Sequence, residues 1–207
     1  MEITAQMVKE LREATGASVL SCKQALEQFG GDFEQAKTYL AEKGLATARK
    51  KAGRAANEGI IETYQHPGGR IGVMLELNCE TDFVSSTEMF KNLAHDLALH
   101  IAFANPKYIR IEDIPAEVIE ERRAYYASEA KAEGKPDHII DRIVDGRLEK
   151  WYADTVLLEQ PFVKDGDQKI NDLIIQAIAQ LKENIVVSRF ARFELGEATL
   201  PPEGGEE

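Results

Sequence analysis

The chain has 207 residues, of which 43% are hydrophobic and 29% are charged, a composition typical of globular proteins with one or two domains. The formal net charge of −11 makes the surface as a whole repel phosphate groups, which argues against direct binding to nucleic acid or to anionic membranes. No run of residues approaches the roughly 18 apolar positions of a membrane span, and no secretory signal is visible at the N-terminus.

These features predict a cytoplasmic protein. The two cysteines, Cys22 and Cys79, are far apart and form no Cys-x-x-Cys pair, which suits a reducing compartment. The stroma or matrix of an organelle stays open as an alternative, because a transit peptide that has been removed leaves no trace in the sequence.

The first 45 residues predict three short helices. Thr4 is a candidate N-cap of the first and Gly16 ends it, while Gly30-Gly31 precedes Asp32, a candidate N-cap of the third. A core this small is marginal alone, so we expect residues 1–45 to be a docking module attached to a larger body. Apolar residues recur at helical spacing along these segments: Met7, Leu11, Ala14, Cys22, Leu26, Phe29, Phe33, Ala36 and Leu40.

Residues 46–57 predict a solvent-exposed connecting helix. The segment has good helix propensity apart from Gly53, and it has few large apolar residues to bury. Its basic residues raise contact with RNA as an alternative. No aromatic residues for base stacking accompany them, so a solvated helix is the preferred interpretation. The basic residues are Arg49, Lys50, Lys51 and Arg54.

From residue 58 the pattern changes to strands mixed with helices, which predicts a core over residues 58–196. Residues 59–66 have strand character, and residues 71–77 alternate between apolar side chains and others. Joined by the turn at residues 66–70, they predict a β-hairpin with one buried face. A helix ended by Asn105-Pro106 follows, with an apolar stripe of Phe90, Leu93, Leu97 and Ile101.

The second half of the core predicts a helical insert at about residues 115–159, broken near Gly134-Lys-Pro136. A closing helix over residues 168–182 and a final strand over residues 185–195 complete it. The acidic tail, residues 197–207, is expected to be disordered. The predicted fold class is α+β, with a three-helix module followed by a small antiparallel sheet packed with helices.

The sequence offers no set of residues typical of catalysis. The four histidines form no metal-binding pattern and there is no glycine-rich phosphate loop, so we predict no enzyme activity, no metal and no cofactor. Cys79 lacks an activating neighbour and is interpreted as a structural thiol. Glu80 and Asp82 form a candidate carboxylate pair for acid–base or metal chemistry, a weaker alternative because no third ligand or companion base accompanies them.

The segment Glu76-Leu-Asn-Cys-Glu-Thr-Asp-Phe-Val84 links the apolar strand to the next helix. Ser85 with Glu88 three residues later matches a capping box, which predicts a helix beginning at Ser85 with Val84 packed beside it. Phe83 then falls in the loop before the cap, where two interpretations stay open. Its ring either folds back onto the core or projects as an aromatic anchor for a partner.

Five segments, in the same order along the chain, resemble signatures of the elongation factor Ts family of bacteria and organelles. In the first, the family usually has glycine at Ser18 and an acidic residue at Ser21, so a cap or contact made by that acidic residue is in doubt. Val19 and Leu20 replace two methionines and keep their apolar character. The segments are Leu11-Arg-Glu-Ala-Thr-Gly-Ala-Ser-Val-Leu-Ser-Cys-Lys23, Lys50-Lys-Ala-Gly-Arg54 with Glu58-Gly59, Leu77-Asn-Cys-Glu-Thr-Asp-Phe-Val84, Leu158-Glu-Gln-Pro161 and Arg192-Phe-Glu-Leu-Gly196.

The resemblance implies a guanine nucleotide exchange factor that acts on the GTPase elongation factor Tu. It implies that residues 1–45 are similar to a ubiquitin-associated domain and dock on the nucleotide-binding domain of that partner. Phe83 then enters between two partner helices as a wedge and disturbs the elements that hold Mg²⁺ and the phosphates. The matching docking positions are Lys9, Arg12, Val19, Leu20 and Lys23, and the matching wedge positions are Thr81, Asp82, Phe83 and Val84.

The length of the chain bears on assembly. Longer members of the family contain a duplicated core subdomain, whereas this chain has room for one copy. We therefore expect a homodimer that pairs through the strand over residues 185–195. An alternative from another functional class is a ubiquitin-associated-type adaptor or chaperone, which binds partners through residues 1–45 and has no effect on bound nucleotide.

Overall fold

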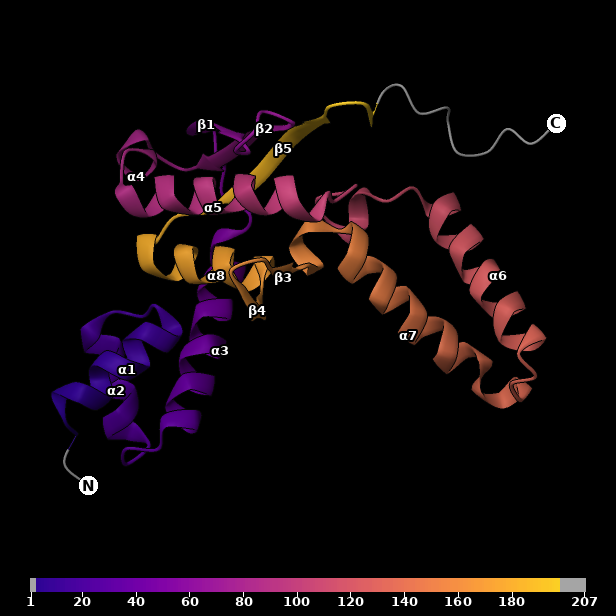
Figure 1. Ribbon diagram of the computed structural model, residues 1–207. Coiled ribbons are helices and arrows are strands. Elements are labelled where there is room, and N and C mark those ends of the chain that lie inside the picture. The colour runs from indigo at the N-terminus through magenta and orange to yellow at the C-terminus, as the bar shows by residue number, and fades with distance from the viewer. Residues whose placement is uncertain (1–2, 198–207) are drawn as a thin grey trace. The chain divides into compact units, whose positions relative to one another are not determined.

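The computed structural model describes residues 3–197 (Figure 1). Helices and a small sheet are mixed along this part of the chain, which confirms the predicted α+β class. The chain divides into two compact units, whose boundaries differ from those of the predicted domains, and the predicted docking module and core stay predictions. The first unit contains the chain up to Tyr64 with Met74–Ala98 and Asp172–Ala191, and the second contains Gln65–Val73, Leu99–Asn171 and the chain from Arg192 on.

Three helices open the first unit, and the capping residues predicted for them are in place. The hydroxyl oxygen of Thr4 accepts the N–H of Met7 at 3.2 Å, and Gly16 ends the first helix with a φ of 64°. The carboxylate of Asp32 caps the third helix in the same way. The helices are α1 (Ala5–Thr15), α2 (Val19–Gln28) and α3 (Phe33–Lys51).

The core shared by these helices is small and apolar. Leu11, Cys22, Leu26 and Ala36 are fully buried within it, and Leu40 is nearly so. All of them lie on the predicted apolar stripes. The prediction is wrong for Ala14, which is exposed, and it omitted Val8, which is buried.

α3 is longer than predicted. Residues 46–51 form its last turns and residues 52–57 are not helical, so the prediction of a separate connecting helix over residues 46–57 is wrong. One face of α3 is buried up to this extension: Ala48 within it is 8% exposed, and a Cβ built at Gly44 just before it would lie 3.7 Å from side-chain atoms of both Ile175 and Ala179 in α8 (Ile170–Leu181). The burial was not expected because the α3 residues that make it are small.

A three-stranded sheet has the order β1-β2-β5. Val73, Leu75 and Leu77 are buried while their neighbours are exposed or half-buried, as the alternation predicts. Gly59 has a φ of 148°, and a Cβ there would collide with the carbonyl oxygen of Leu77, so only glycine fits this close approach of two strands. The strands are β1 (Glu58–Gln65), β2 (Ile71–Cys79) and β5 (Val186–Glu194).

The helix after β2 presents its predicted stripe inward. In α5 (Glu88–Ala104), Phe90, Leu97 and Ile101 are fully buried, and Asn105 ends the helix with a φ of 46°. α5 and α8 have more apolar sequences than the other long helices of residues 3–197, and both supply fully buried side chains.

Two long helices make up much of the second unit, over the stretch that the sequence predicts to be helical and broken near Gly134. Ala130, Ile140, Val144 and Leu148 form a separate small core between them. A short hairpin follows. The sequence did not predict it, because its first strand has only two residues and its second is polar and does not alternate. The elements are η1 (Ile111–Asp113), α6 (Ala116–Ala132), α7 (Asp137–Thr155), η2 (Leu157–Glu159), β3 (Pro161–Phe162) and β4 (Asp165–Lys169).

Among residues 3–197, no helix is long and apolar enough to cross a membrane. The predicted acidic tail lies outside the described residues from residue 198 on.

Candidate functional site

The candidate site is the turn between β2 and α5, which we call the corner and define as residues 80–84. A single helical turn, α4 (Asp82–Ser85), forms most of it. Thr81 is its N-cap: its hydroxyl oxygen accepts the backbone N–H of Val84, with the oxygen and the nitrogen 3.5 Å apart. The corner therefore begins a helix of its own and is not a loop.

The predicted capping box at Ser85 is wrong. Ser85 is the last residue of α4, and its hydroxyl donates to the carbonyl oxygen of Asp82 at 2.9 Å. Thr87, just before the following helix, caps it, since its hydroxyl oxygen accepts the N–H of Phe90 at 3.3 Å. Thr81, Ser85 and Thr87 all have a hydroxyl group that can cap a helix. Ser85 was predicted to be the cap because Glu88 follows it at the spacing of a capping box, whereas Thr81 and Thr87 make the caps in the structure.

Phe83 is exposed over 83% of its surface, which excludes the interpretation in which its ring folds back onto the core. Its neighbour Val84 is buried. Successive residues of a helix point about 100° apart, so a turn that buries Val84 directs Phe83 outward. The exposed ring thus follows from the local geometry of α4.

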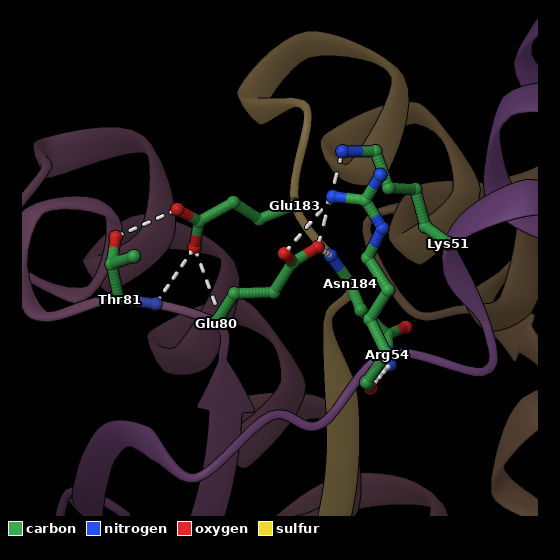
Figure 2. Close-up of polar contacts among 6 residues, drawn as sticks. All are labelled: Lys51, Arg54, Glu80, Thr81, Glu183 and Asn184. Carbon is green, nitrogen blue, oxygen red and sulfur yellow. Dashed lines mark hydrogen bonds and ion pairs between the residues drawn. The ribbon is translucent and has the colours of Figure 1, made fainter.

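One carboxylate holds the start of the corner. Glu183, in the segment between α8 and β5, accepts the N–H of Glu80 at 3.1 Å and that of Thr81 at 3.0 Å through Oε2. Its Oε1 accepts the hydroxyl of Thr81 at 2.6 Å. Figure 2 shows the Glu183 side chain reaching across to Thr81 and to the backbone of Glu80.

The carboxylate of Glu80, within the corner, binds in turn to the segment that carries Glu183. Oε1 of Glu80 accepts the N–H of Asn184 at 2.7 Å, and the side-chain amide of Asn184 donates to the carbonyl oxygen of Arg54 at 2.8 Å. Arg54 Nη1 lies 3.2 Å from Oε2 of Glu80, and Lys51 Nζ lies 4.0 Å from Oε1 (Figure 2). The hydrogen bond from Asn184 and the two cations lower the pKa of Glu80.

These contacts change the interpretation of two sequence features. The side chain of Lys51 is only 17% exposed, so Lys51 and Arg54 at the end of the basic run serve as partners of Glu80 and are not simply solvated. Acid catalysis near neutral pH requires a carboxyl group with a raised pKa, whereas the pKa of Glu80 is lowered, which argues against Glu80 as the acid of a Glu80–Asp82 catalytic pair. Within residues 3–197, no group of three or more potential ligands is placed to hold a metal ion.

Cys79 is the last residue of β2 and directly precedes the corner. Its side chain is fully buried, its thiol donates to the carbonyl oxygen of Thr81 at 3.1 Å, and burial raises its pKa. A buried thiol with a raised pKa is unreactive, in agreement with the structural interpretation.

The predicted docking residues lie on α1 and at the start of α2, and all of them are exposed. Val19 and Leu20 occupy the first turn of α2, where Leu20 is 64% exposed. Ser18 caps this helix by accepting the N–H of Ser21 at 3.1 Å, so the cap is present although no acidic residue stands at Ser21. The remaining docking residues, Lys9, Arg12 and Lys23, are surface cations, two of which pair with glutamates four residues later in the same helix.

Glu183 and Asn184 were not predicted as part of the site. They lie between α8 and β5, just before the buried Ile185, and Lys182 just before them has a φ of 62°. The only local signal was that Glu183 and Asn184 are two polar residues in a short connection between a helix and a strand. It did not show that the partners lie 102 to 104 residues away.

A family model for elongation factor TS matches residues 2–197, nearly the whole chain. The chain belongs to the elongation factor Ts family. Curated proteins named elongation factor Ts are similar over nearly their full length. That of Carboxydothermus hydrogenoformans is 54% identical over 97% of this chain and 93% of its own length. Those of Caldanaerobacter subterraneus subsp. tengcongensis and Coprothermobacter proteolyticus are 56% and 55% identical, over 94% and 95% of this chain and 98% and 100% of their own. Family membership makes the protein a translation elongation factor.

Proposed function

We propose that the protein is a guanine nucleotide exchange factor that promotes release of GDP from elongation factor Tu, so that GTP can take its place. The observation that carries this proposal is the exposed ring of Phe83 on a corner held by two carboxylates. An aromatic side chain exposed on a well-anchored helical turn is the type of residue that dominates the energy of protein interfaces.

The proposed mechanism needs no covalent chemistry and no metal or cofactor of the chain's own. A GTPase holds the phosphates of GDP with Mg²⁺, which neutralises their charge, so moving the elements that hold the ion and the phosphates speeds the dissociation of GDP. Phe83 acts as the wedge, while Thr81, Asp82 and Val84 shape the turn that carries it. Because linkage is reciprocal, a factor that prefers the nucleotide-free partner is released when GTP binds.

Docking precedes this step. We assign the first contact to the exposed apolar pair Val19 and Leu20 with the surface cations Lys9, Arg12 and Lys23. Cations placed around an apolar patch speed association with an acidic partner surface and set its orientation. The protein acts where its partner is, which we take to be the cytoplasm.

We also propose a homodimer. β5 lies at one edge of the three-stranded sheet, so a second copy can pair with it there. Sedimentation at micromolar concentration tests this: a dimer is expected, and a fully active monomer would remove the proposal.

Stopped-flow measurement of fluorescent GDP leaving elongation factor Tu tests the main proposal. The chain should accelerate release, and the double variant Asp82→Ala with Phe83→Ala should lose about 1–3 kcal/mol of that effect, or roughly 5- to 150-fold in rate. Phe103→Ala is the matched control, because that ring is 76% exposed but belongs to the other unit. Binding without any acceleration by the unaltered chain would favour the adaptor or chaperone alternative.

A further inference from the structure

We propose that Glu183 is a positioning residue for nucleotide exchange: it holds α4 in one orientation, so that Phe83 is already in its working direction before the partner arrives. This inference rests on the proposed function. It assigns a role to a residue that lies a hundred positions after Phe83 in the sequence.

The geometry gives Glu183 control over the start of α4. It binds two successive backbone N–H groups, those of Glu80 and Thr81, and the hydroxyl of Thr81. The same Thr81 oxygen accepts the N–H of Val84 and so caps the helical turn. A continuous chain of hydrogen bonds therefore runs from Glu183 through Thr81 to Val84, the residue next to Phe83.

The segment that carries Glu183 is itself fixed. The backbone N–H of Asn184 donates to Glu80, and its side chain donates to the carbonyl oxygen of Arg54, just after α3. A shift of residues 183–184 would break contacts with two other segments of the same unit. Glu183 can therefore transmit the position of the sheet and of α3 to the corner.

The corner needs this support because it is short. A single helical turn has no stability of its own in water, since its formation orders several residues for one or two hydrogen bonds. Without Glu183 the turn would sample other orientations. The partner would then have to order it during exchange, which lowers the rate of the step in which the ring acts.

The test separates docking from the exchange step. Stimulated GDP release from elongation factor Tu is measured at increasing concentrations of the chain, which gives a half-saturating concentration and a maximal rate. For Glu183→Ala we expect the maximal rate to fall about tenfold, since several charge-assisted hydrogen bonds are lost, with the half-saturating concentration unchanged within about twofold. Glu183→Gln should recover much of the rate, because the amide can accept the backbone N–H groups and donate to Thr81.

Two controls exclude a general loss of stability. Glu76→Ala removes another glutamate with a short contact, to Arg189 at 2.7 Å, in the same unit but away from the corner, and it should leave both kinetic parameters unchanged. In a Phe83→Ala background, Glu183→Ala should have little further effect on the maximal rate, because a residue that acts through the ring has nothing left to position.

The outcomes distinguish this inference from the function on which it rests. If the unaltered chain fails to accelerate GDP release, the proposed function is wrong. If it accelerates release and Phe83→Ala slows it, while Glu183→Ala keeps the full maximal rate, the positioning role is overturned. Equal losses from Glu183→Ala with and without Phe83, or a similar loss in Glu76→Ala, would also overturn it.

Discussion

The backbone N–H of Glu80 donates to the carboxylate of Glu183 at 3.1 Å, and the carboxylate of Glu80 in turn accepts the N–H of Asn184, the residue that follows Glu183, at 2.7 Å. Each carboxylate thus satisfies backbone donors of the other's segment. Two like charges lie close to each other in this arrangement. Lys51 and Arg54 on one side and three N–H or O–H donors on the other compensate for them.

The first prediction concerns acid stability. The pKa of Glu80 is lowered in the folded protein, chiefly by the hydrogen bond from Asn184, so its ionised form stabilises the fold above the ordinary glutamate pKa of about 4.3. This contribution is lost as pH falls below that value and Glu80 takes up a proton. Glu80→Gln should therefore lower the free energy of unfolding in urea at pH 7, and the deficit should shrink below about pH 4.

The matching control for that experiment is Glu88→Gln, which removes an exposed acidic residue of the same unit that begins α5. Its effect at pH 7 should be smaller than that of Glu80→Gln. Equal effects of the two substitutions at every pH would contradict the assignment of the stabilising contacts to Glu80.

The second prediction concerns Gly59. A side chain there must adopt a φ of 148° and would collide with the carbonyl oxygen of Leu77, so Gly59→Ala should destabilise the protein by about 1–3 kcal/mol or more. Gly72→Ala is the control in the same sheet, since a Cβ at Gly72 meets no atom within 4 Å. Thermal unfolding of the two variants should differ clearly; matching midpoints would show that the strands separate at little cost.

The third prediction concerns His100, which is buried in the second unit. Its Nε2 lies 2.9 Å from Gln160 Oε1, and its Nδ1 accepts the N–H of Val163 at 3.3 Å. Burial lowers the pKa of His100, an effect that the hydrogen bond with Gln160 partly opposes. The unfolded chain then takes up a proton at higher pH than the folded chain, so stability is complete above about pH 6.5 and falls as pH drops below it.

His100→Gln should flatten this dependence, because glutamine does not titrate. The measurement is the free energy of unfolding between pH 7.5 and about pH 5, compared with that of His138→Gln, an exposed histidine of the same unit. If the slope in the His100→Gln variant equals that of the unaltered chain, His100 is not the group responsible.

The fourth prediction separates docking from exchange. Replacing both Val19 and Leu20 by serine should raise the half-saturating concentration of stimulated GDP release about tenfold while leaving the maximal rate unchanged. Leu195→Ser is the control, since Leu195 is 66% exposed, much like Leu20, but belongs to the other unit. A fall in the maximal rate alone would place these two residues in the exchange step and not in docking.

Local signals in the sequence predicted much of the fold. The caps at Thr4 and Asp32, the glycine stop at Gly16 and the alternation along β2 depend on nearby residues only, and each is found in the structure. The extent of α3 was missed because Gly44 packs on a helix more than a hundred residues later in the sequence. No local pattern reveals such a contact.

The candidate site shows the same division. The resemblance to the family located the corner and Phe83, and the sequence left two interpretations of the ring open. The exposed position of that ring follows from a helical turn capped by Thr81, whereas a competing capping pattern at Ser85 predicted a loop. The residues that hold the turn, Glu183 and Asn184, could not be found because their contacts join distant parts of the chain.

The unbroken course of α3 has a mechanical consequence. At about 1.5 Å per residue, its 19 residues span about 28 Å, from the small core that supports α1 and α2 to Lys51 beside Glu80. The helix thus sets the spacing between the docking surface proposed above, at Val19 and Leu20, and the corner that carries the proposed wedge Phe83. One residue inserted into α3 would rotate one end of the helix against the other by about 100°. The docking surface and the corner could then no longer contact the same partner molecule at once.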